Sequence, residues 1–118
     1  MSNNREKGRL GETIAADYLM KNGYRIIEKN YRTKLGEIDL IAEKDNILVF
    51  IEVKSRSNTN FGFPYEAVNR KKINRIIKAS LVYLKQKGYE NYQIRYDIIE
   101  IFLSRDGKIN HIKNAFCM

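Results

Sequence analysis

Hydrophobic positions repeat at helical spacing in two stretches of the chain. In Arg5–Lys21, the apolar residues that share one helical face are Leu10, Ile14, Ala15, Tyr18 and Leu19. In about Tyr65–Lys87, they are Ile73, Ile76, Ile77, Leu81 and Leu84. Glycines supply the stop signals, at Asn22-Gly23 for the first stretch and at Gly88 for the second. The pattern predicts two amphipathic helices.

Shorter runs of β-prone residues predict strands between and after these helices. Three strands are expected between the helices, at Tyr24–Thr33, Glu37–Glu43 and Ile47–Ser55. Two more are expected after the second helix, at Gln93–Leu103 and Lys108–Ile112. The order helix, three strands, helix, two strands predicts a single α/β domain over residues 1–118, with about five strands flanked by helices.

The second and third predicted strands form a hairpin whose register follows from its tip. An even-length turn at Asp45-Asn46 places Lys44 opposite Ile47 and, further along, Asp39 opposite Glu52. One face of the sheet is then wholly apolar and predicted to be core, with Ile38, Leu40, Ala42, Val49, Ile51 and Val53. The other face is apolar near the tip and charged at its far end, with Glu37, Asp39, Ile41, Phe50, Glu52 and Lys54.

The opposed acids Asp39 and Glu52 indicate a cation site. Two like charges that face each other across strands are unfavourable unless a cation lies between them. Carboxylate oxygens suit a hard divalent ion such as Mg²⁺ or Mn²⁺, which also takes phosphate oxygens as ligands. Lys54, two residues after Glu52 on the same face, would place an ammonium beside such an ion. The hairpin therefore predicts a metal site that acts on phosphate.

A simpler interpretation of the same residues stays open. A Glu-x-Lys triplet is usually part of a solvated strand face, and the hairpin register offers a cross-strand ion pair between Glu37 and Lys54. A turn of odd length would shift the register and remove the opposition of Asp39 and Glu52.

Charge and composition narrow the function classes. The 118 residues hold 22 Lys and Arg against 14 Asp and Glu, a net charge of +8 that favours a polyanionic partner such as nucleic acid. With one cysteine, Cys117, and one histidine, His111, the chain cannot build an internal disulfide, a Cys-rich zinc site or a two-histidine site. Its longest apolar run, Ile47–Ile51, is far below the roughly 20 residues of a membrane span. We expect a cytoplasmic protein with no membrane-bound state.

Basic residues gather at two places where nucleic acid could bind. Lys71, Arg75 and Lys78 form a stripe along the second helix, which has no acidic residue between Val68 and Gly88. Such a stripe is also typical of an ordinary solvated helix face. Near the charged end of the hairpin, the expected backbone contacts are Arg32, Lys34 and Arg56. The loop Asn58–Phe63, polar with two aromatics, would either reach a nucleic-acid groove or anchor on the core.

Several strings in the sequence together resemble a known family. GEIDLIA at 36–42 and VFIEVKSR at 49–56 follow GRLGETIAADYLMKNGY at 8–24, and Gly62, Glu66-Ala67-Val68 and Lys71-Lys72 come after them. In order and spacing, this pattern resembles the YraN-like family. That family is similar to the archaeal Holliday junction resolvases and belongs with the restriction-endonuclease-like, or PD-(D/E)xK, nucleases.

The resemblance implies a mixed β-sheet flanked by helices and a metal-dependent site that hydrolyses DNA phosphodiesters, with branched or junction DNA as the substrate class. It makes Asp39, Glu52 and Glu12 the metal ligands and Lys54 the catalytic lysine, with the Val53 carbonyl as a further ligand. A homodimer is expected for symmetric cutting of two strands, although no interface is legible in the sequence.

Three alternatives remain beside this expectation. Glu12 lies early in the first helix, where the helix dipole alone favours an acidic residue. The whole chain would also fit a non-catalytic nucleic-acid-binding module that keeps the nuclease scaffold. A protein-interaction role is weaker, because it explains neither the net charge nor the opposed acids.

Overall fold

The computed structural model describes residues 4–56, 69–103 and 108–118, and within these ranges the chain forms two helices and five strands. In chain order they are α1 (Asn4–Lys21), β1 (Arg25–Arg32), β2 (Glu37–Lys44), β3 (Ile47–Arg56), α2 (Arg70–Lys87), β4 (Gln93–Phe102) and β5 (Lys108–Phe116). The predicted α/β class and the predicted order of helices and strands are confirmed. The predicted loop Ser57–Pro64 lies outside the described residues.

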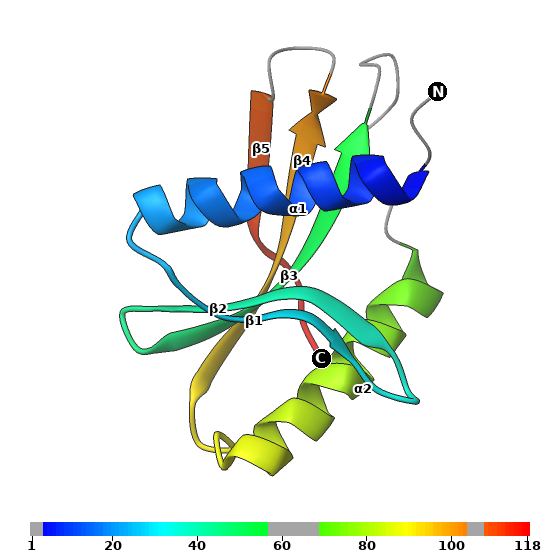
Figure 1. The fold of residues 1–118 in the computed structure, drawn as a ribbon. Helices are drawn as coiled ribbons and strands as arrows, with labels where there is room; N and C mark the ends of the chain where they lie inside the picture. Colours follow the sequence, from blue (N-terminus) through cyan, green and yellow to red (C-terminus); the bar gives the residue numbers. More distant parts are fainter. Residues whose placement is uncertain (1–3, 57–68, 104–107) are drawn as a thin grey trace.

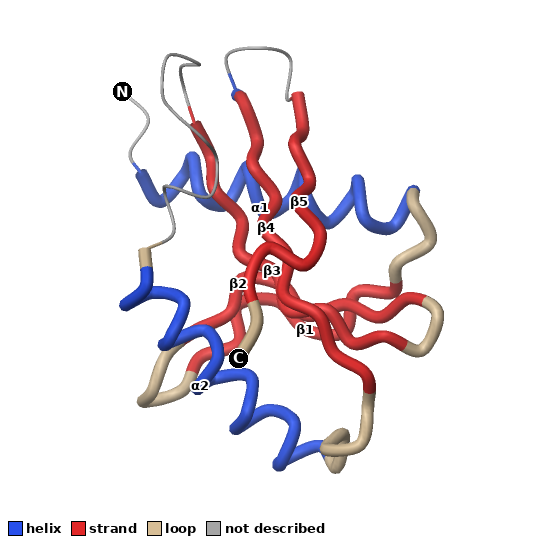
Figure 2. The backbone as a smooth tube through the Cα atoms, turned by 180° about the vertical axis from the view of Figure 1, so that it is seen from behind, coloured by secondary structure: helices blue, strands red, loops and turns tan. Residues whose placement is uncertain are grey.

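The strands form one mixed sheet in the order β1-β2-β3-β4-β5. β3 and β4 are parallel neighbours, while the pairs β1–β2, β2–β3 and β4–β5 are antiparallel. A parallel pair needs a long connection, and α2 lies in the connection between β3 and β4. Figure 1 and the reverse view in Figure 2 show the sheet strongly twisted, with α1 across one face and α2 across the other.

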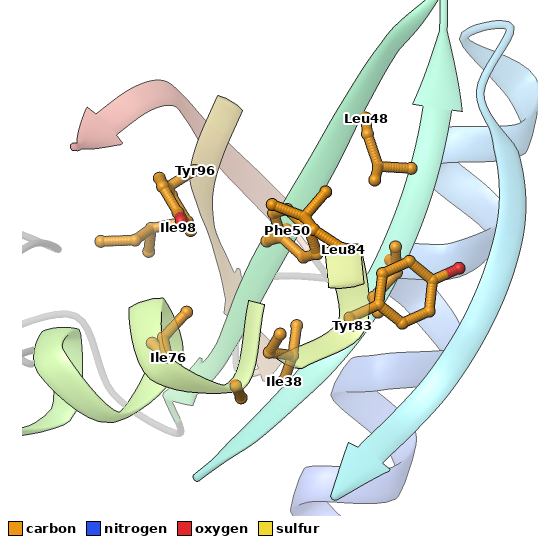
Figure 3. Close-up of a cluster of buried hydrophobic side chains, with 10 residues drawn as sticks. Ile38, Leu48, Phe50, Ile76, Tyr83, Leu84, Tyr96 and Ile98 are labelled. Atoms are coloured by element: carbon orange, nitrogen blue, oxygen red, sulfur yellow. The ribbon is translucent and has the colours of Figure 1, made fainter. Parts of the chain in front are cut away.

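Each helix covers its own apolar core. The core on the α2 side contains Phe50, Ile76, Tyr83, Tyr96 and Ile98 among its buried residues, and Figure 3 shows these side chains between α2 and the strands. The core on the α1 side is built from smaller residues: Ala15, Ala16, Leu19, Leu40, Ala42, Val49, Ile51, Ile99 and Ile101 are all buried there. A sheet covered on both faces explains the nearly continuous apolar stretches in β2, β3 and β4.

The hairpin register predicted from the Asp45-Asn46 tip is confirmed for the five residue pairs from Lys44↔Ile47 to Leu40↔Ile51. Beyond Leu40, β2 remains paired with β1 as far as Glu37 but is no longer paired with β3. The prediction that Ile38 shares a face with Leu40 is wrong, because Ile38 packs in the α2-side core with Phe50. Regular alternation therefore ends at Asp39, where β2 leaves its partner.

Both helices differ from the prediction in which residues they bury, and α2 also differs in where it begins. Leu10 and Leu81, predicted on the buried faces, are 52% and 47% exposed, and small residues such as Ala16 and Ala79 are buried instead. α2 begins at Arg70 rather than Tyr65, because Asn69 has extended backbone and its side chain caps the helix by accepting the Lys72 N–H at 2.9 Å. No helix in the described ranges has both the length and the apolar character needed to cross a membrane.

Two glycines let the helices approach the strands closely. A methyl group added at Gly11 would overlap the Ser55 side chain, so α1 crosses β3 there. A methyl group added at Gly36 would overlap the main-chain carbonyl of Arg75, so α2 lies directly against the turn between β1 and β2. The second contact brings the first turns of α2 beside Asp39 and Glu52.

Candidate functional site

The site is built around a pair of carboxyl groups, the half-buried Asp39 on β2 and the buried Glu52 on β3. The Val53 N–H donates to Asp39 Oδ2 at 2.8 Å, so the side chain of Asp39 takes the acceptor role that a backbone carbonyl has elsewhere in the ladder. Glu52 is only 4% exposed, and the two carboxyl groups lie close enough for Asp39 to repel the charged form of Glu52. The sequence correctly placed these two acids together.

A lysine of α2 supplies a positive charge to this pair. Lys72 Nζ lies 2.6 Å from Glu52 Oε1, while its own side chain is 45% exposed. The N-cap at Asn69 fixes the first turn of α2, and the close contact at Gly36 holds the helix against the sheet. In the sequence, Lys72 stands out only as part of the family pattern. The signal for its role was the absence of acidic partners within α2, which left its basic residues to find partners on other elements.

Burial sets the protonation behaviour of the pair. Desolvation, followed by repulsion from Asp39, raises the pKa of Glu52 to about 7, although the Lys72 ammonium opposes the shift. Burial also raises the pKa of Asp39, against the Val53 N–H and the hydrogen bond from Glu52. Burial lowers the pKa of Lys72, but its bond to Glu52 outweighs this and the net shift is upward. Burial therefore disfavours the charged form of Glu52 even with Lys72 in place.

Glu12 lies beside this pair but is engaged elsewhere. Its side chain hydrogen-bonds to Asn30, a non-glycine residue held at φ 53°, and burial followed by repulsion from Asp39 raises its pKa. It lines a hollow of about 520 Å³ together with Gly8, Arg9, Asn30 and Arg32. Asn30 and Arg9 were not singled out from the sequence.

The donor set fits a divalent ion through two carboxylates rather than three. Within residues 4–56, 69–103 and 108–118, no three Asp, Glu, His or Cys side chains lie close enough to hold one metal ion together. The predicted cluster of Glu12, Asp39 and Glu52 is therefore not assembled. Mg²⁺ commonly takes one or two protein carboxylates, and the neighbouring carboxylates of Asp39 and Glu52 meet that requirement.

The two basic residues that follow Glu52 on β3 differ in their surroundings. Lys54 is half-buried and, among the described residues, makes no ion pair with Asp39 or Glu52. Arg56 donates to the buried carboxylate of Glu100, and only 16% of its side chain is exposed. Its charge is therefore already paired with a buried acid, which the sequence did not indicate.

The alternative ion pair between Glu37 and Lys54 does not form. Glu37 lies on the part of β2 that has left β3, and its carboxylate is 3.6 Å from Arg32 on β1 instead. The interpretation of the charged face as a simple cross-strand ladder is therefore wrong.

Exposed cations line a hollow at the start of α2. Lys71, Lys72 and Arg75 surround a space of about 310 Å³ with Asn69, Glu37 and Ile76. Lys78, further along α2, is exposed, as are Arg32 and Lys34 at the turn between β1 and β2. The loop Asn58–Phe63 lies outside the described residues.

Comparison with known proteins assigns the family. The model of "Uncharacterised protein family UPF0102" matches residues 11–101. The chain belongs to the UPF0102 family. A UPF0102 protein of Clostridioides difficile is 49% identical over 114 residues, which cover 97% of this chain and 99% of that protein. A UPF0102 protein of Caldanaerobacter subterraneus is also 49% identical, over 118 residues and 97% of each chain.

Among solved structures, SfsA of Pyrococcus furiosus in complex with Ca²⁺ aligns with 94% of this UPF0102 chain and 64% of its own. The sequence identity is 17% and the TM-score is 0.36, values too low to support any argument about function.

This UPF0102 protein also contains a buried polar network that the sequence did not reveal. Asp97 on β4 is fully buried and accepts hydrogen bonds from Arg95, from His111 Nε2 at 2.7 Å and from the Asn114 N–H at 2.9 Å. Tyr18 of α1 meets the other ring nitrogen of His111 at 2.8 Å. The predicted last strand ended at Ile112, but β5 continues to Phe116, so His111 is an interior strand residue.

Proposed function

We propose that this protein is a metal-dependent nuclease that hydrolyses DNA phosphodiester bonds, with branched or junction DNA as its substrate class. The observation that supports this proposal is the pair of half-buried Asp39 and buried Glu52 beside a hollow lined by Lys71, Lys72 and Arg75. A buried carboxylate pair suits a divalent cation, and a cationic hollow suits a phosphate chain. The resemblance to restriction-endonuclease-like proteins, in the strings around these acids, points the same way.

Asp39 and Glu52 would hold Mg²⁺ or Mn²⁺, with the Val53 carbonyl as a further oxygen ligand and Glu12 on the neighbouring rim. When bound, such an ion polarises the scissile phosphate and lowers the pKa of water. Burial of Glu52 keeps bulk water away from the carboxyl pair, which strengthens its interaction with a cation.

The remaining charged residues would bind and orient the substrate. Lys71 and Arg75 would neutralise phosphates in the hollow. Arg32 and Lys34, at the turn between β1 and β2, would bind the backbone of the DNA strand. Lys54, on the same face of β3 as Glu52, would align the attacking water and oppose charge that develops on the phosphate.

Cleavage of nicked, flapped and four-way DNA in Mn²⁺ tests the proposal. Glu52→Ala should lower the rate by about 100-fold or more, because it removes half of the carboxyl pair. Glu90→Ala, at an exposed acid after α2, is the matched control and should cleave like the wild type. Cleavage that survives Glu52→Ala undiminished would place the activity at another site or in a contaminant.

A non-catalytic nucleic-acid-binding module is the second candidate function. Lys72 already neutralises Glu52, which gives the pair a cation without any metal and thus favours this alternative. It predicts binding that weakens with salt, and no cleavage product with any divalent ion.

The proposal includes a homodimer, because symmetric cutting of a junction needs two active sites, and light scattering of the free protein tests it.

We also propose that the protein works in the cytoplasm, where a free and exposed thiol such as Cys117 stays reduced.

A further inference from the structure

Lys72 belongs to two neighbouring environments at once. Its ammonium bonds to Glu52 Oε1 at 2.6 Å, yet its side chain also lines the hollow formed by Lys71 and Arg75. The lysine side chain is flexible, and a small change in its torsion angles moves the ammonium by several ångströms. The same cation can therefore neutralise either the carboxyl pair or a phosphate in the hollow.

The exposure of the two partners distinguishes this ion pair from a fixed one. The neighbouring pair of Arg56 and Glu100 is enclosed at both ends, with side chains 16% and 1% exposed. In the pair of Lys72 and Glu52 the acid is 4% exposed but the lysine is 45% exposed. The buried acid needs a cation permanently, whereas the lysine loses little when it returns to solvent.

A divalent cation on Asp39 and Glu52 would compete with Lys72 directly. The ammonium occupies one oxygen of Glu52, and its charge also acts on Asp39. Two cations at one carboxylate repel each other strongly in a site this buried. Lys71, the adjacent residue on α2, makes no ion pair within the described residues and points to the same hollow.

We infer that Lys72 is an exchangeable counter-ion, which neutralises the carboxyl pair in the metal-free protein and moves into the hollow beside Lys71 and Arg75 when a divalent cation binds. The inference rests on the proposed function, because it assumes that Asp39 and Glu52 bind a metal. Its consequence is an order of binding. When metal binds, Lys72 joins Lys71 and Arg75 in the hollow, so three cations can bind phosphate. Without metal, Lys72 stays bonded to Glu52 and only the other two cations can bind phosphate.

Calorimetric titration with Mn²⁺ tests the competition. Lys72→Met should bind Mn²⁺ about tenfold more tightly than the wild type, because the competing ammonium is gone. Lys71→Met is the matched control, since it removes the same charge from the same helix turn without touching Glu52, and it should stay within about twofold of the wild type. The titrations are run near pH 8.5, so that in Lys72→Met a proton on the carboxyl pair does not compete with Mn²⁺ in place of the missing ammonium.

Amine acylation of the wild-type protein, followed by mass spectrometry, tests the movement without any substitution. Adding Mn²⁺ should raise the acylation rate of Lys72 several-fold and leave that of Lys71 nearly unchanged. This measurement stands even where Lys72→Met fails to fold.

The outcomes separate this inference from the proposed function. Saturable Mn²⁺ binding that is equal or weaker in Lys72→Met than in Lys71→Met would overturn the inference and leave the metal site standing. Acylation of Lys72 that does not respond to Mn²⁺ would overturn it as well. The absence of saturable Mn²⁺ binding in all three proteins would overturn the proposed function together with the inference.

Discussion

Among single residues, the buried acids determine how the basic residues are used. Glu52, Asp97 and Glu100 are each 4% exposed or less, and each is neutralised by a basic side chain: Lys72, Arg95 and Arg56 respectively. Burying a carboxylate without such a partner would cost several kcal/mol. Three of the positive charges counted in the sequence therefore neutralise buried acids, and of these three only Lys72 also lines the exposed hollow.

The network around Asp97 leads to a stability prediction. Asp97→Asn removes a buried charge that Arg95, His111 and the Asn114 N–H all contact, so the free energy of unfolding should fall by about 3 kcal/mol. Urea denaturation followed by circular dichroism at neutral pH measures the loss. Asp17→Asn, at an exposed position on α1, is the control and should change stability by no more than about 0.5 kcal/mol.

The same variant has an expected pH dependence. Hydrogen bonds from His111 and Arg95 outweigh burial and lower the pKa of Asp97. Its contribution to stability is therefore complete above the unfolded-state value of about 3.9 and is lost as the pH falls through the lower folded-state value. The difference between wild type and Asp97→Asn should shrink below about pH 4. A constant difference down to acid unfolding would mean that the charge of Asp97 is not what stabilises the fold.

Among the elements, α2 is the one that completes the site. Its side chains supply Lys72 to the carboxyl pair and Lys71 and Arg75 to the hollow, while its buried face packs on the sheet. The close approach at Gly36 determines how deeply its first turns lie against β2. The reach of Lys72 to Glu52 thus depends on a glycine in another part of the chain.

Gly36→Ala tests this dependence. The added methyl group would overlap the Arg75 carbonyl, so α2 must shift, and we expect a loss of about 1–3 kcal/mol in the free energy of unfolding. The shift should also weaken nucleic-acid binding, measured by fluorescence anisotropy. Gly8→Ala is the matched control, because an added methyl group meets nothing within 4 Å and helix propensity favours alanine. Equal stability of the two variants would contradict the proposed contact.

In the whole molecule, the two helices cover opposite faces of the sheet and their first halves flank the carboxyl pair. The hollow that contains Glu12 is lined by residues of α1 and by Arg32 of β1. The hollow at the start of α2 is lined by residues of that helix and by Glu37 of β2. The 3.6 Å contact between Arg32 and Glu37 lies between the two hollows. A nucleic-acid strand that follows both hollows would pass over the contact between Arg32 and Glu37.

This arrangement predicts a localised effect of charge on nucleic-acid binding. Reversing Lys71 and Arg75 to Glu should weaken binding. It should also make the negative slope of log affinity against log salt shallower by about 2, because each lost phosphate contact removes about 0.9. Reversing Lys85 and Lys87 instead makes the same change in net charge at the other end of α2. If both double variants weaken binding equally, net charge alone attracts the nucleic acid and the hollow has no special role.

Much of the fold followed from the sequence because local pattern and turn chemistry act over short distances. The hairpin tip at Asp45-Asn46, where both residues have positive φ, fixed the register from Lys44↔Ile47 to Leu40↔Ile51. The same register placed Asp39 near Glu52. It failed at Ile38, because β2 is paired with β3 only as far as Leu40 and the alternation of faces breaks at Asp39, although β2 stays paired with β1.

The sequence by itself determined the order of helices and strands, the surplus of positive charge and the meeting of Asp39 with Glu52 across a short hairpin. Only the tertiary structure decided which cation neutralises Glu52, that Arg56 is neutralised by Glu100, and that Asp97 and His111 form an interior network. Each of these contacts joins residues at least 14 positions apart in the sequence, on different elements. Hydrophobic spacing determines which face of an element is buried, whereas the partner of a long charged side chain depends on how closely the packed elements approach.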